Sequence, residues 1–461
     1  ALTQFFSRFT EQKGYCGIGS VKSNIGHLLA AAGLAGLIKT VLCLEHKALV
    51  PTLGIEKVNP ALSFEKSPFY PVLELQEWEL KGEKVRRAGV SSFGFGGTNA
   101  HVVLEEAPQD HGTEEEKCFS GDTLQIITVS GRTEESLEQN VSRLAEWITG
   151  QHKLADISYT KNVLREHFPY RKAYLASDAN ELKEFLLYHT GGNVKQISGS
   201  PQKNLPGVLF FFPGEGAQCI EMTSNLYQSF PVFRRYMDEC FALFDADLKN
   251  ESNFMLPAIF SVDYSLAKSW LELGIKPQYI AGYGVGKFAA ACIADLIKLE
   301  DAANLVLSYS KHLSGRYEAG QKQMQVGEDG YDEIASVLDT ANISSPFAFK
   351  LIPESGQTPQ QKPLYFPGDL KAVADELQRE GCQIIIQVGP GQIDELNGRG
   401  VKILASTGSK SGGDWETLLN SLGYLYVHGF SINWAALYGS NHKNSPSLPT
   451  YAFVEKSYWL R

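Results

Sequence analysis

The sequence predicts an α/β protein of several domains. Its 461 residues, 43% of them hydrophobic, are enough to form two to four domains with separate buried cores. From residue 208 to about residue 312, apolar strand-like runs alternate with helical stretches, which is typical of a parallel sheet with crossover helices. Two polar, loop-rich stretches, residues 105–121 and 198–206, divide the chain into parts.

The composition argues against several classes of function. The formal net charge is -10, with acidic and basic residues interspersed, which argues against a nucleic-acid groove. The seven cysteines never form a C-x-x-C pair, so we expect neither a disulfide framework nor a metal site, and a reducing cytoplasm fits best. No apolar run reaches about 18 residues, so we expect no membrane span and no signal peptide. The chain starts at Ala1 without an initiator Met, and we expect it to be a piece of a longer protein.

Local patterns predict the elements of the first half. Residues 26–46 are predicted to form an Ala-rich helix, and a glycine-dense run at 91–101 leads into a strand at 102–104. A strand at 124–129 precedes a helix that Thr133 can cap. Apolar residues recur along one face of that helix, at Leu137, Val141, Leu144 and Ile148.

The second half contains three strands of the buried type, predicted at 208–212, 280–281 and 384–386. Residues 313–382 are predicted to be patchy, with loops rich in Gly, Gln, Ser and Pro. The tail from Asn441 is polar and then aromatic. We expect it to bury several rings, because it carries more aromatic area than a free end should expose, at Tyr451, Phe453, Tyr458 and Trp459, together with Leu460.

The turn after the strand at 280–281 has the shape of a nucleophile elbow. It reads Gly282-Tyr283-Gly284-Val285-Gly286 and opens an Ala-rich helix near Phe288. In G-x-S-x-G enzymes the central residue of this turn is the nucleophilic serine. Here it is Gly284, which has no side chain to attack a carbonyl or to hold an acyl group.

A nucleotide-binding loop is the alternative interpretation of the same glycines. A P-loop requires G-x-x-x-x-G-K-[ST], but Ala281 replaces the first glycine and Phe288 follows Lys287, so a hydroxyl for Mg²⁺ is missing. A dinucleotide fingerprint requires a further glycine pattern and an acid about 20 residues later. We expect no nucleotide binding at this turn, and equilibrium dialysis with ATP and NAD would check it.

Two stretches in the first hundred residues could carry chemistry. His27 lies at the start of the helix predicted at 26–46, five residues after Lys22. It could donate a hydrogen bond to a substrate carbonyl, since a helix start favours the neutral imidazole, or it could be an ordinary structural histidine. The glycines at 94–97 either present backbone N–H groups to an oxyanion or form a tight hairpin.

Taken in order, these and further stretches resemble a modular polyketide synthase. VKSNIGHLLAAAGLAGLIKTVL and AGVSSFGFGGTNAHVVLEEAP resemble the C-terminal half of a ketosynthase. LADISYTKNVLREHFPYRKAYLAS is similar to the following linker domain, and FFFPGEGAQ and AGYGVGKFAAACIADLI to an acyltransferase. SLPTYAFVEKSYWL resembles the post-acyltransferase linker, so the resemblance covers nearly the whole chain in the family's order.

The resemblance implies four domains. Residues 1–107 would be half of a thiolase-like α/β/α ketosynthase, packed as if awaiting the other half, and residues 108–206 a small α/β linker domain. Residues 207–430 would be an α/β-hydrolase-like acyltransferase core and residues 431–461 the post-acyltransferase linker. The small subdomain of the acyltransferase would be truncated, because the segment that normally carries the A-F-H-S motif is not recognisable.

For the ketosynthase, the resemblance implies that His27 is one of two active-site histidines. It would polarise the extender thioester during decarboxylative condensation, with Lys22 as a supporting cation. The backbone amide of Phe95 would complete the oxyanion hole. The nucleophilic cysteine and the other histidine are expected before residue 1, since neither Cys16 nor Cys43 has a matching context.

For the acyltransferase, the resemblance implies loss of every catalytic group that can be checked. Gly284 replaces the serine and Tyr283 the histidine before it. Tyr309 replaces the arginine that pairs with the malonyl carboxylate, and Glu215 replaces a glutamine near the oxyanion position. The general base should fall between His312 and His428, where the chain has no histidine.

The resemblance also implies partners. Extender units would be loaded in trans onto the phosphopantetheine of a partner acyl carrier protein, with no cofactor bound to this chain. A homodimer through the ketosynthase and contact with the rest of the module are expected. Alternatively, the inactive domain is an interaction platform for the external acyltransferase or the carrier protein. The two hypotheses differ in whether removing residues 207–430 would cripple extender loading.

Overall fold

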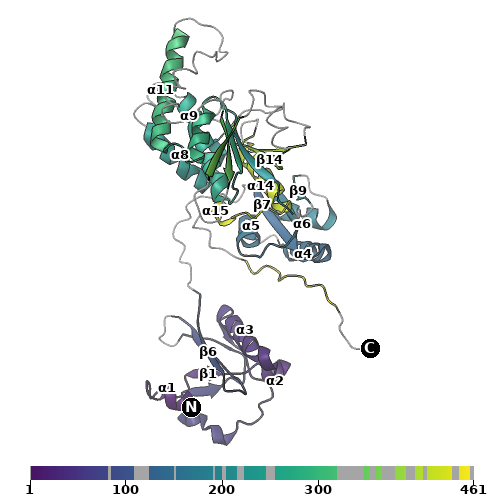
Figure 1. Ribbon diagram of the computed structural model, residues 1–461. Helices are drawn as coiled ribbons and strands as arrows, with labels where there is room; N and C mark the ends of the chain where they lie inside the picture. Colours follow the sequence, from purple (N-terminus) through teal and green to yellow (C-terminus); the bar gives the residue numbers. More distant parts are fainter. Residues whose placement is uncertain are drawn as a thin grey trace. The chain divides into compact units, whose positions relative to one another are not determined.

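The computed structural model describes most of the chain, in several stretches. These are residues 2–80, 85–107, 124–149, 152–189, 193–199, 204–214, 223–244, 255–318, 347–352, 360–365, 379, 381–390, 400–408, 413–438 and 446–456. The chain divides into two compact units, residues 1–114 and 115–461 (Figure 1).

The first unit contains short helices and pairs of strands. Its helices are α1 (Leu2–Phe6), α2 (Lys22–Ile25) and α3 (Ala32–Glu45), with 3-10 turns at Leu29–Ala31, Pro60–Leu62 and Phe64–Lys66. Its strands pair as β1 (Cys16–Ile18) with β3 (Phe69–Pro71), β2 (Ala48–Leu49) with β4 (Gln76–Glu77), and β5 (Arg87–Phe93) with β6 (Asn99–Glu105). In the described part of this unit no sheet exceeds two strands, as expected for half of a domain.

The core of the first unit is small, and one long helix is poorly covered. The buried hydrophobic residues described in this unit are Cys43, Leu44, Phe69 and Val72. Helix α3 packs on β5, but the apolar side chains of residues 28–42 are largely exposed, with Leu34 62% and Ile38 60% accessible. An apolar patch of this kind marks a contact surface.

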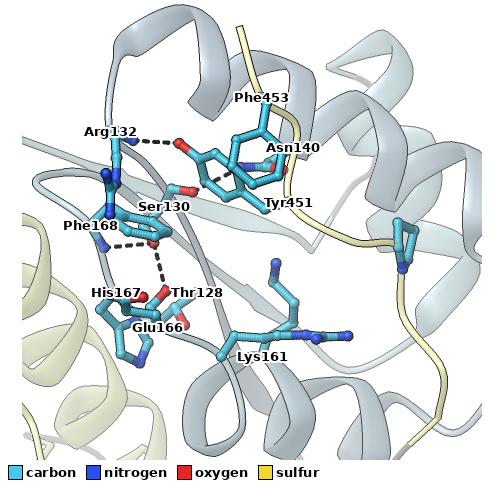
Figure 2. A pocket seen from close by; sticks show the side chains of 12 residues that line it. Thr128, Ser130, Arg132, Asn140, Lys161, Glu166, His167, Phe168, Tyr451 and Phe453 are labelled. Atoms are coloured by element: carbon cyan, nitrogen blue, oxygen red, sulfur yellow. Dashed lines mark hydrogen bonds between the residues drawn. The ribbon is translucent and has the colours of Figure 1, made fainter. Parts of the chain in front are cut away.

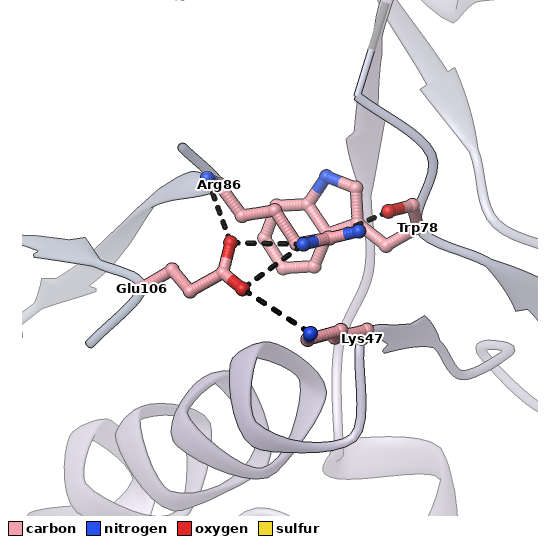
Figure 3. Close-up of polar contacts among 4 residues, drawn as sticks. All are labelled: Lys47, Trp78, Arg86 and Glu106. Carbon is pink, nitrogen blue, oxygen red and sulfur yellow. Dashed lines mark hydrogen bonds and ion pairs between the residues drawn. The ribbon is translucent and has the colours of Figure 1, made fainter. Parts of the chain in front are cut away.

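An ion-pair cluster closes the end of the β5–β6 hairpin (Figure 3). The Nη1 atom of Arg86 lies 3.0 and 2.9 Å from the two carboxylate oxygens of Glu106, and its Nε donates to the carbonyl oxygen of Trp78 at 2.6 Å. Lys47 adds a longer ion pair to Glu106, at 3.9 Å. Hydrogen bonds from Arg86 hold the pKa of Glu106 below its usual value.

The second unit begins with a three-stranded antiparallel sheet covered by helices. Its strands β7 (Gln125–Gly131), β8 (Tyr170–Ala176) and β9 (Lys195–Ser198) are joined through α4 (Glu134–Trp147), α5 (Leu154–Val163) and α6 (Ala179–Tyr188). The predicted cap of α4 is confirmed, since Oγ1 of Thr133 accepts from the Ser136 N–H at 3.1 Å. The predicted apolar face is buried at Leu137, Val141, Leu144 and Ile148.

A larger sheet of six strands follows. Strands β11 (Tyr279–Gly282), β10 (Gly207–Phe212), β14 (Cys382–Gln387) and β15 (Lys402–Ala405) are parallel neighbours in this order. Two antiparallel strands, β12 (Phe347–Ile352) and β13 (Gln360–Tyr365), extend the edge next to β11. Strand β12 pairs with β11, which is distant in the sequence, and the patchy, loop-rich pattern of residues 313–382 did not indicate this pairing.

Helices surround the parallel strands. They are α7 (Ser224–Ser229), α8 (Pro231–Phe244), α9 (Met255–Glu272), α10 (Gly286–Ile293) and α11 (Leu299–Glu318). Helices α8, α9, α10 and α11 pack against one another beside the sheet (Figure 1). None of the helices in the described ranges is long and apolar enough to cross a membrane.

Helix α14 (Asp414–Val427) joins the two sheets of the second unit, and α15 (Ala435–Tyr438) follows it. Helix α14 packs on β7, β8 and β9 on one side and on β15 and α7 on the other. The indole N–H of Trp415 donates to the carbonyl oxygen of Leu124 at 2.8 Å, and Gly423 leaves room for Ile126 and Ile197. One hydrophobic core therefore runs from Ile126 to the strands of the larger sheet.

A buried polar cluster reinforces the same junction. The Tyr438 hydroxyl lies 2.6 Å from Oγ of Ser158 and 2.5 Å from Nδ2 of Asn162. Asn162 also donates to the carbonyl oxygen of Ile126 at 2.8 Å and accepts from the backbone and side chain of Thr128 at 3.0 and 2.7 Å. Asn162 thus uses both ends of its amide in the core.

We predict that Asn162→Ala destabilises the second unit by about 3 kcal/mol. The change leaves buried donors on Thr128 without their acceptor, and each such loss costs on the order of 1–3 kcal/mol. The control Tyr438→Phe leaves Ser158 and Asn162 with other partners and is expected to cost about 1 kcal/mol. Urea unfolding followed by circular dichroism would test this, and equal losses for the two variants would contradict it.

The C-terminal segment, residues 446–456, packs back onto the three-stranded part of the unit. The side chain of Leu448 is buried, and its carbonyl oxygen accepts from Arg165 at 3.1 Å. The Ala452 N–H donates to Oδ1 of Asn140 at 2.8 Å. The expectation of buried rings was wrong for Phe453, whose side chain is 74% exposed because it lies at the outer edge of the segment. Tyr458, Trp459 and Leu460 lie outside the described residues.

Truncation after Ser440 is expected to lower the stability of the second unit by about 3 kcal/mol. Exposing the site of Leu448 costs about 2 kcal/mol, and the lost hydrogen bonds at Asn140 and Arg165 account for the rest. Differential scanning calorimetry would show a lower melting temperature. The variant Lys287→Ala, far along the chain from these contacts, should melt like the parent. An unchanged melting temperature for the truncated protein would refute this role of the segment.

Candidate functional site

The structure confirms the predicted strand, turn and helix around Gly284. Strand β11 ends at Gly282, and α10 begins at Gly286. The turn is closed by the Gly286 N–H, which donates to the carbonyl oxygen of Tyr283 at 2.8 Å. Gly284 has a φ of +49°, in the left-handed region that costs most residues about 1–2 kcal/mol.

The turn lies close to the neighbouring strand. A Cβ atom on Gly286 would lie 2.8 Å from Cβ of Phe212, the last residue of β10. A Cβ atom on Gly282 would lie 2.8 Å from the carbonyl oxygen of Gly286. The flanking glycines therefore allow a close approach that a side chain would prevent, so the geometry of an elbow is retained around a residue without a nucleophile.

We predict that Gly284→Ala lowers the free energy of unfolding by about 1 kcal/mol, because alanine resists a positive φ. The control Gly284→Asn should cost less, because asparagine tolerates the left-handed region better. Thermal unfolding of the three proteins would show the ranking. An Ala variant as stable as the parent would mean that the turn is not held in this conformation.

Aromatic residues occupy two positions where the family resemblance places catalytic groups. Tyr283 is half-buried, and its ring lies 5.8 Å from that of Phe211 on β10. Tyr309 on α11 lies 6.1 Å from Phe288 on α10, between ring centroids, and packs on the main core. Both side chains thus have packing roles beside the turn. Glu215 lies outside the described residues.

The thiol of Cys292, in the helix that follows the turn, is not a substitute nucleophile. Cys292 lies in α10, six residues after the start of that helix, and is buried. Burial raises the pKa of its thiol to about 12, so the reactive thiolate is scarce at neutral pH. In the described part of the chain, no group of three or more His, Cys, Asp or Glu side chains could hold a metal ion.

A buried carboxyl group lies at the carboxyl edge of the same parallel strands. Asp263 on α9 is fully buried, and neither carboxyl oxygen has a hydrogen-bond partner among the described residues. A Cβ atom on Gly389, just after β14, would lie 1.8 Å from Oδ1 of Asp263. Burial raises the pKa of this carboxyl group well above its usual value, which favours the neutral acid. Sequence reasoning missed it, although a carboxylate inside a strongly apolar helix was a usable signal.

In the first unit, the structure fixes the tautomer of His27. The side chain is exposed, and its Nδ1 accepts a hydrogen bond from the Leu29 N–H at 3.0 Å. The neutral imidazole therefore carries its proton on Nε2, where it can donate to a ligand. The helix expected from residue 26 begins only at Ala32, because Leu29 adopts a left-handed φ of +52° and interrupts it.

Lys22 and Phe95 are also exposed. Lys22 is the first residue of α2, and its carbonyl oxygen accepts from the Gly26 N–H at 2.9 Å. Phe95 is at the tip of the β5–β6 hairpin, where the described hydrogen bonds engage the amides of Gly94 and Gly97. The glycine run is thus a tight hairpin turn, and its Phe95 amide faces no described acceptor.

The packing of α3 on β5 brings the segment with His27 and the turn with Phe95 to the same end of the unit. A Cβ atom on Gly33 would lie 3.0 Å from Oγ of Ser92, and one on Gly36 would lie 3.5 Å from a methyl group of Val90. Helix α3 therefore starts beside the last residues of β5, where the hairpin turn begins. The segment before α3, with His27, and the turn with Phe95 belong to the same end of the unit.

Three known families match successive stretches of the chain. Residues 1–56 match the beta-ketoacyl synthase C-terminal domain, and residues 59–175 match the ketoacyl-synthetase C-terminal extension. Residues 209–337 match the acyl transferase domain. Strand β11, most of β10 and the elbow fall in the acyl transferase match, and His27 falls in the synthase match.

Curated relatives share this order over longer stretches. The chain is 37% identical over 326 residues to a phenolphthiocerol/phthiocerol polyketide synthase of Mycobacterium tuberculosis, covering 64% of this chain and 22% of the relative. It is 31% identical over 409 residues to the erythronolide synthase EryA2 of Saccharopolyspora erythraea, covering 83% of this chain and 11% of the relative. The chain thus spans less than a quarter of the length of either relative.

A solved structure shows the fold of the second unit. The acyl transferase domain of ZmaA aligns with a TM-score of 0.57 at 20% identity, covering 71% of this chain and 99% of that domain. The protein is therefore an α/β multidomain chain that joins a C-terminal ketosynthase domain, of thiolase-like fold, to an acyltransferase domain. These are domains of a modular polyketide synthase.

Proposed function

We propose that this chain belongs to a polyketide synthase module whose ketosynthase catalyses condensation and whose acyltransferase is inactive. The observation that carries the second part is Gly284, which occupies the centre of an intact elbow without a nucleophile. We assign residues 1–107 to the ketosynthase, 108–206 to the linker domain, 207–430 to the acyltransferase and 431–461 to the post-acyltransferase linker. The truncated small subdomain of the acyltransferase is part of this assignment.

In the ketosynthase, His27 would act as a hydrogen-bond donor. Its Nε2–H can stabilise the negative charge that forms on the thioester oxygen when the extender loses carbon dioxide. The resulting enolate would then attack the acyl group held by a cysteine in the rest of the domain. Lys22 would support this charge, and the amide of Phe95 would donate to the second oxyanion.

The exposed apolar side of α3 supports the proposed context. Residues such as Leu34 and Ile38 would be covered by the remainder of the ketosynthase, and the domain would form a homodimer. The growing chain and the extender would arrive on the phosphopantetheine of an acyl carrier protein in the cytoplasm. Because the resident acyltransferase lacks a nucleophile, a separate acyltransferase would load the extender in trans.

A second candidate function is a non-catalytic interaction platform for that external acyltransferase or for the carrier protein. The observation that favours it is the retained architecture. The parallel sheet, the elbow and the junction through α14 are intact although the catalytic residue is missing. A domain that is retained for its fold would hold its neighbours apart and would also offer a surface on which the external acyltransferase or the carrier protein can bind.

The proposal predicts that radiolabelled malonyl-CoA leaves no covalent label on residues 207–430. No nucleophile occupies the elbow, and Tyr283 and Tyr309 have packing roles in place of catalytic ones. The variant Gly284→Ser should also remain unlabelled, since the base and the carboxylate-binding arginine would still be missing. An acyltransferase with an intact serine elbow serves as the positive control. Strong labelling of either protein at this elbow would overturn the assignment of inactivity.

A further inference from the structure

A cavity of about 340 Å³ lies between the three-stranded part of the second unit and the C-terminal segment 446–456. Its walls come from the end of β7, helix α5, the loop between α5 and β8, and the C-terminal segment (Figure 2). None of the residues that line it belongs to the elbow or to the region around His27. The cavity is therefore separate from both candidate catalytic sites.

The charged groups around this cavity are mostly positive. Arg132, Lys161 and Arg165 line it, and the lining includes a single carboxylate, that of Glu166. Arg165 is anchored by its hydrogen bond to the Leu448 carbonyl oxygen, and the guanidinium of Arg132 lies 5.2 Å from the ring centre of Phe168. The arginines thus have structural contacts that fix them at the wall.

Lys161 differs from these arginines. Its side chain extends from α5 into the space below Tyr451 and Phe168 (Figure 2), and its ammonium group has no hydrogen bond or ion pair with any described residue. Burial, and then the charge of Arg165, lower its pKa to about 8. A half-buried cation without a partner costs stability, and a bound anion would offset this cost.

The remaining ionisable groups do not supply that anion. The ring of His167 is held at both nitrogens, by the Tyr426 hydroxyl and the Asn162 carbonyl oxygen, each at 2.9 Å. Burial lowers the pKa of His167, which favours its neutral form. Glu166 is exposed, so water competes for its carboxylate. The cavity therefore has a net positive charge at neutral pH.

Another part of the wall is aromatic and lies beside Arg132 and above Lys161 in Figure 2. The rings of Phe168 and Tyr451 lie 4.9 Å apart, and those of Tyr451 and Phe453 lie 5.0 Å apart. The Tyr451 hydroxyl is held by the Arg132 backbone N–H at 2.8 Å. Phe453, which is largely exposed, thus continues an apolar wall that starts inside the cavity.

We propose that this cavity binds a phosphate-bearing ligand, with the phosphate beside Lys161, Arg132 and Arg165 and the rest of the ligand along the aromatic wall. A phosphate monoester carries more than one negative charge, which suits three cations better than a single carboxylate would. Free 4′-phosphopantetheine is such a monoester, coenzyme A carries a pyrophosphate and a 3′-phosphate monoester, and the arm of a carrier protein carries a phosphodiester with a single charge. The inference does not depend on the proposed inactivity of the acyltransferase.

Isothermal titration calorimetry of the full chain with coenzyme A, 4′-phosphopantetheine and pantetheine tests this proposal at pH 7. The two phosphorylated compounds are expected to bind, and pantetheine, which lacks the phosphate, is expected to bind at least tenfold more weakly. Lys161→Met should weaken binding of the phosphorylated compounds at least tenfold. The control Lys276→Met, at an exposed lysine outside the cavity, should leave it unchanged.

The pH dependence gives a readout that a purely structural lysine would not produce. Affinity should fall as the pH rises from 7 to 9, because Lys161 loses its proton near pH 8. Lys161→Arg should keep the affinity at pH 7 and lose most of this pH dependence, since arginine stays protonated. Without ligand, Lys161→Met should melt at a higher temperature than the parent, because it removes an unpaired charge.

The arms of the titration also distinguish the source of the phosphate. Tighter binding of coenzyme A than of 4′-phosphopantetheine would indicate a free nucleotide, and equal binding would indicate that the phosphopantetheine part, which a carrier protein also bears, is recognised without the nucleotide. Failure of both phosphorylated compounds to bind, equal binding of pantetheine, or unchanged binding to Lys161→Met would overturn the proposal. None of these results depends on covalent labelling at the elbow, so the proposed function is tested separately.

Discussion

The second unit depends on helix α14, which is buried on both sides. Its residues contact the antiparallel sheet β7-β8-β9 and the region of β15, so the two sheets share one hydrophobic core. Such a helix cannot exchange one neighbour for water without exposing several apolar side chains. The polar cluster of Asn162, Ser158 and Tyr438 then fixes how α15 lies against α5, since buried amide and hydroxyl groups require specific partners. The linker and acyltransferase parts therefore behave as one body.

This junction gives a physical reason why the acyltransferase fold is retained around an elbow whose central residue is a glycine. Removing residues 207–430 would also remove α14, uncover the side of β7, β8 and β9 on which it packs, and leave Arg171 without the carbonyl oxygens of Tyr426 and Phe430, to which it donates at 3.0 and 2.8 Å. Substitution at the elbow has no such consequence, because Gly284 takes the turn's left-handed conformation at little cost. A glycine at the centre of the elbow is thus compatible with a domain on whose fold its neighbours depend.

In the first unit, a candidate catalytic residue is held by a hydrogen bond although the hydrophobic core is small. Its described core is small and its sheets are narrow, yet it holds His27 with a defined tautomer. The left-handed backbone at Leu29 directs the Leu29 N–H to Nδ1 and so leaves Nε2–H available. Local strain at Leu29 prepares the hydrogen-bond donor here, whereas the apolar side of α3 is exposed.

The sequence by itself determined the features that depend on neighbouring residues. The strand, turn and helix at Gly284, the cap at Thr133 and the apolar face of α4 were predictable, because hydrophobic period, capping and glycine conformation act over a few positions. Family-specific motifs placed the ketosynthase and acyltransferase parts in order. Only the tertiary structure decided the rest. Strand β12, the buried Asp263 beside Gly389, and the cavity where Lys161 meets the C-terminal segment each join residues that are far apart in the chain. Their burial and charge depend on which distant atoms become neighbours, and no local pattern records this.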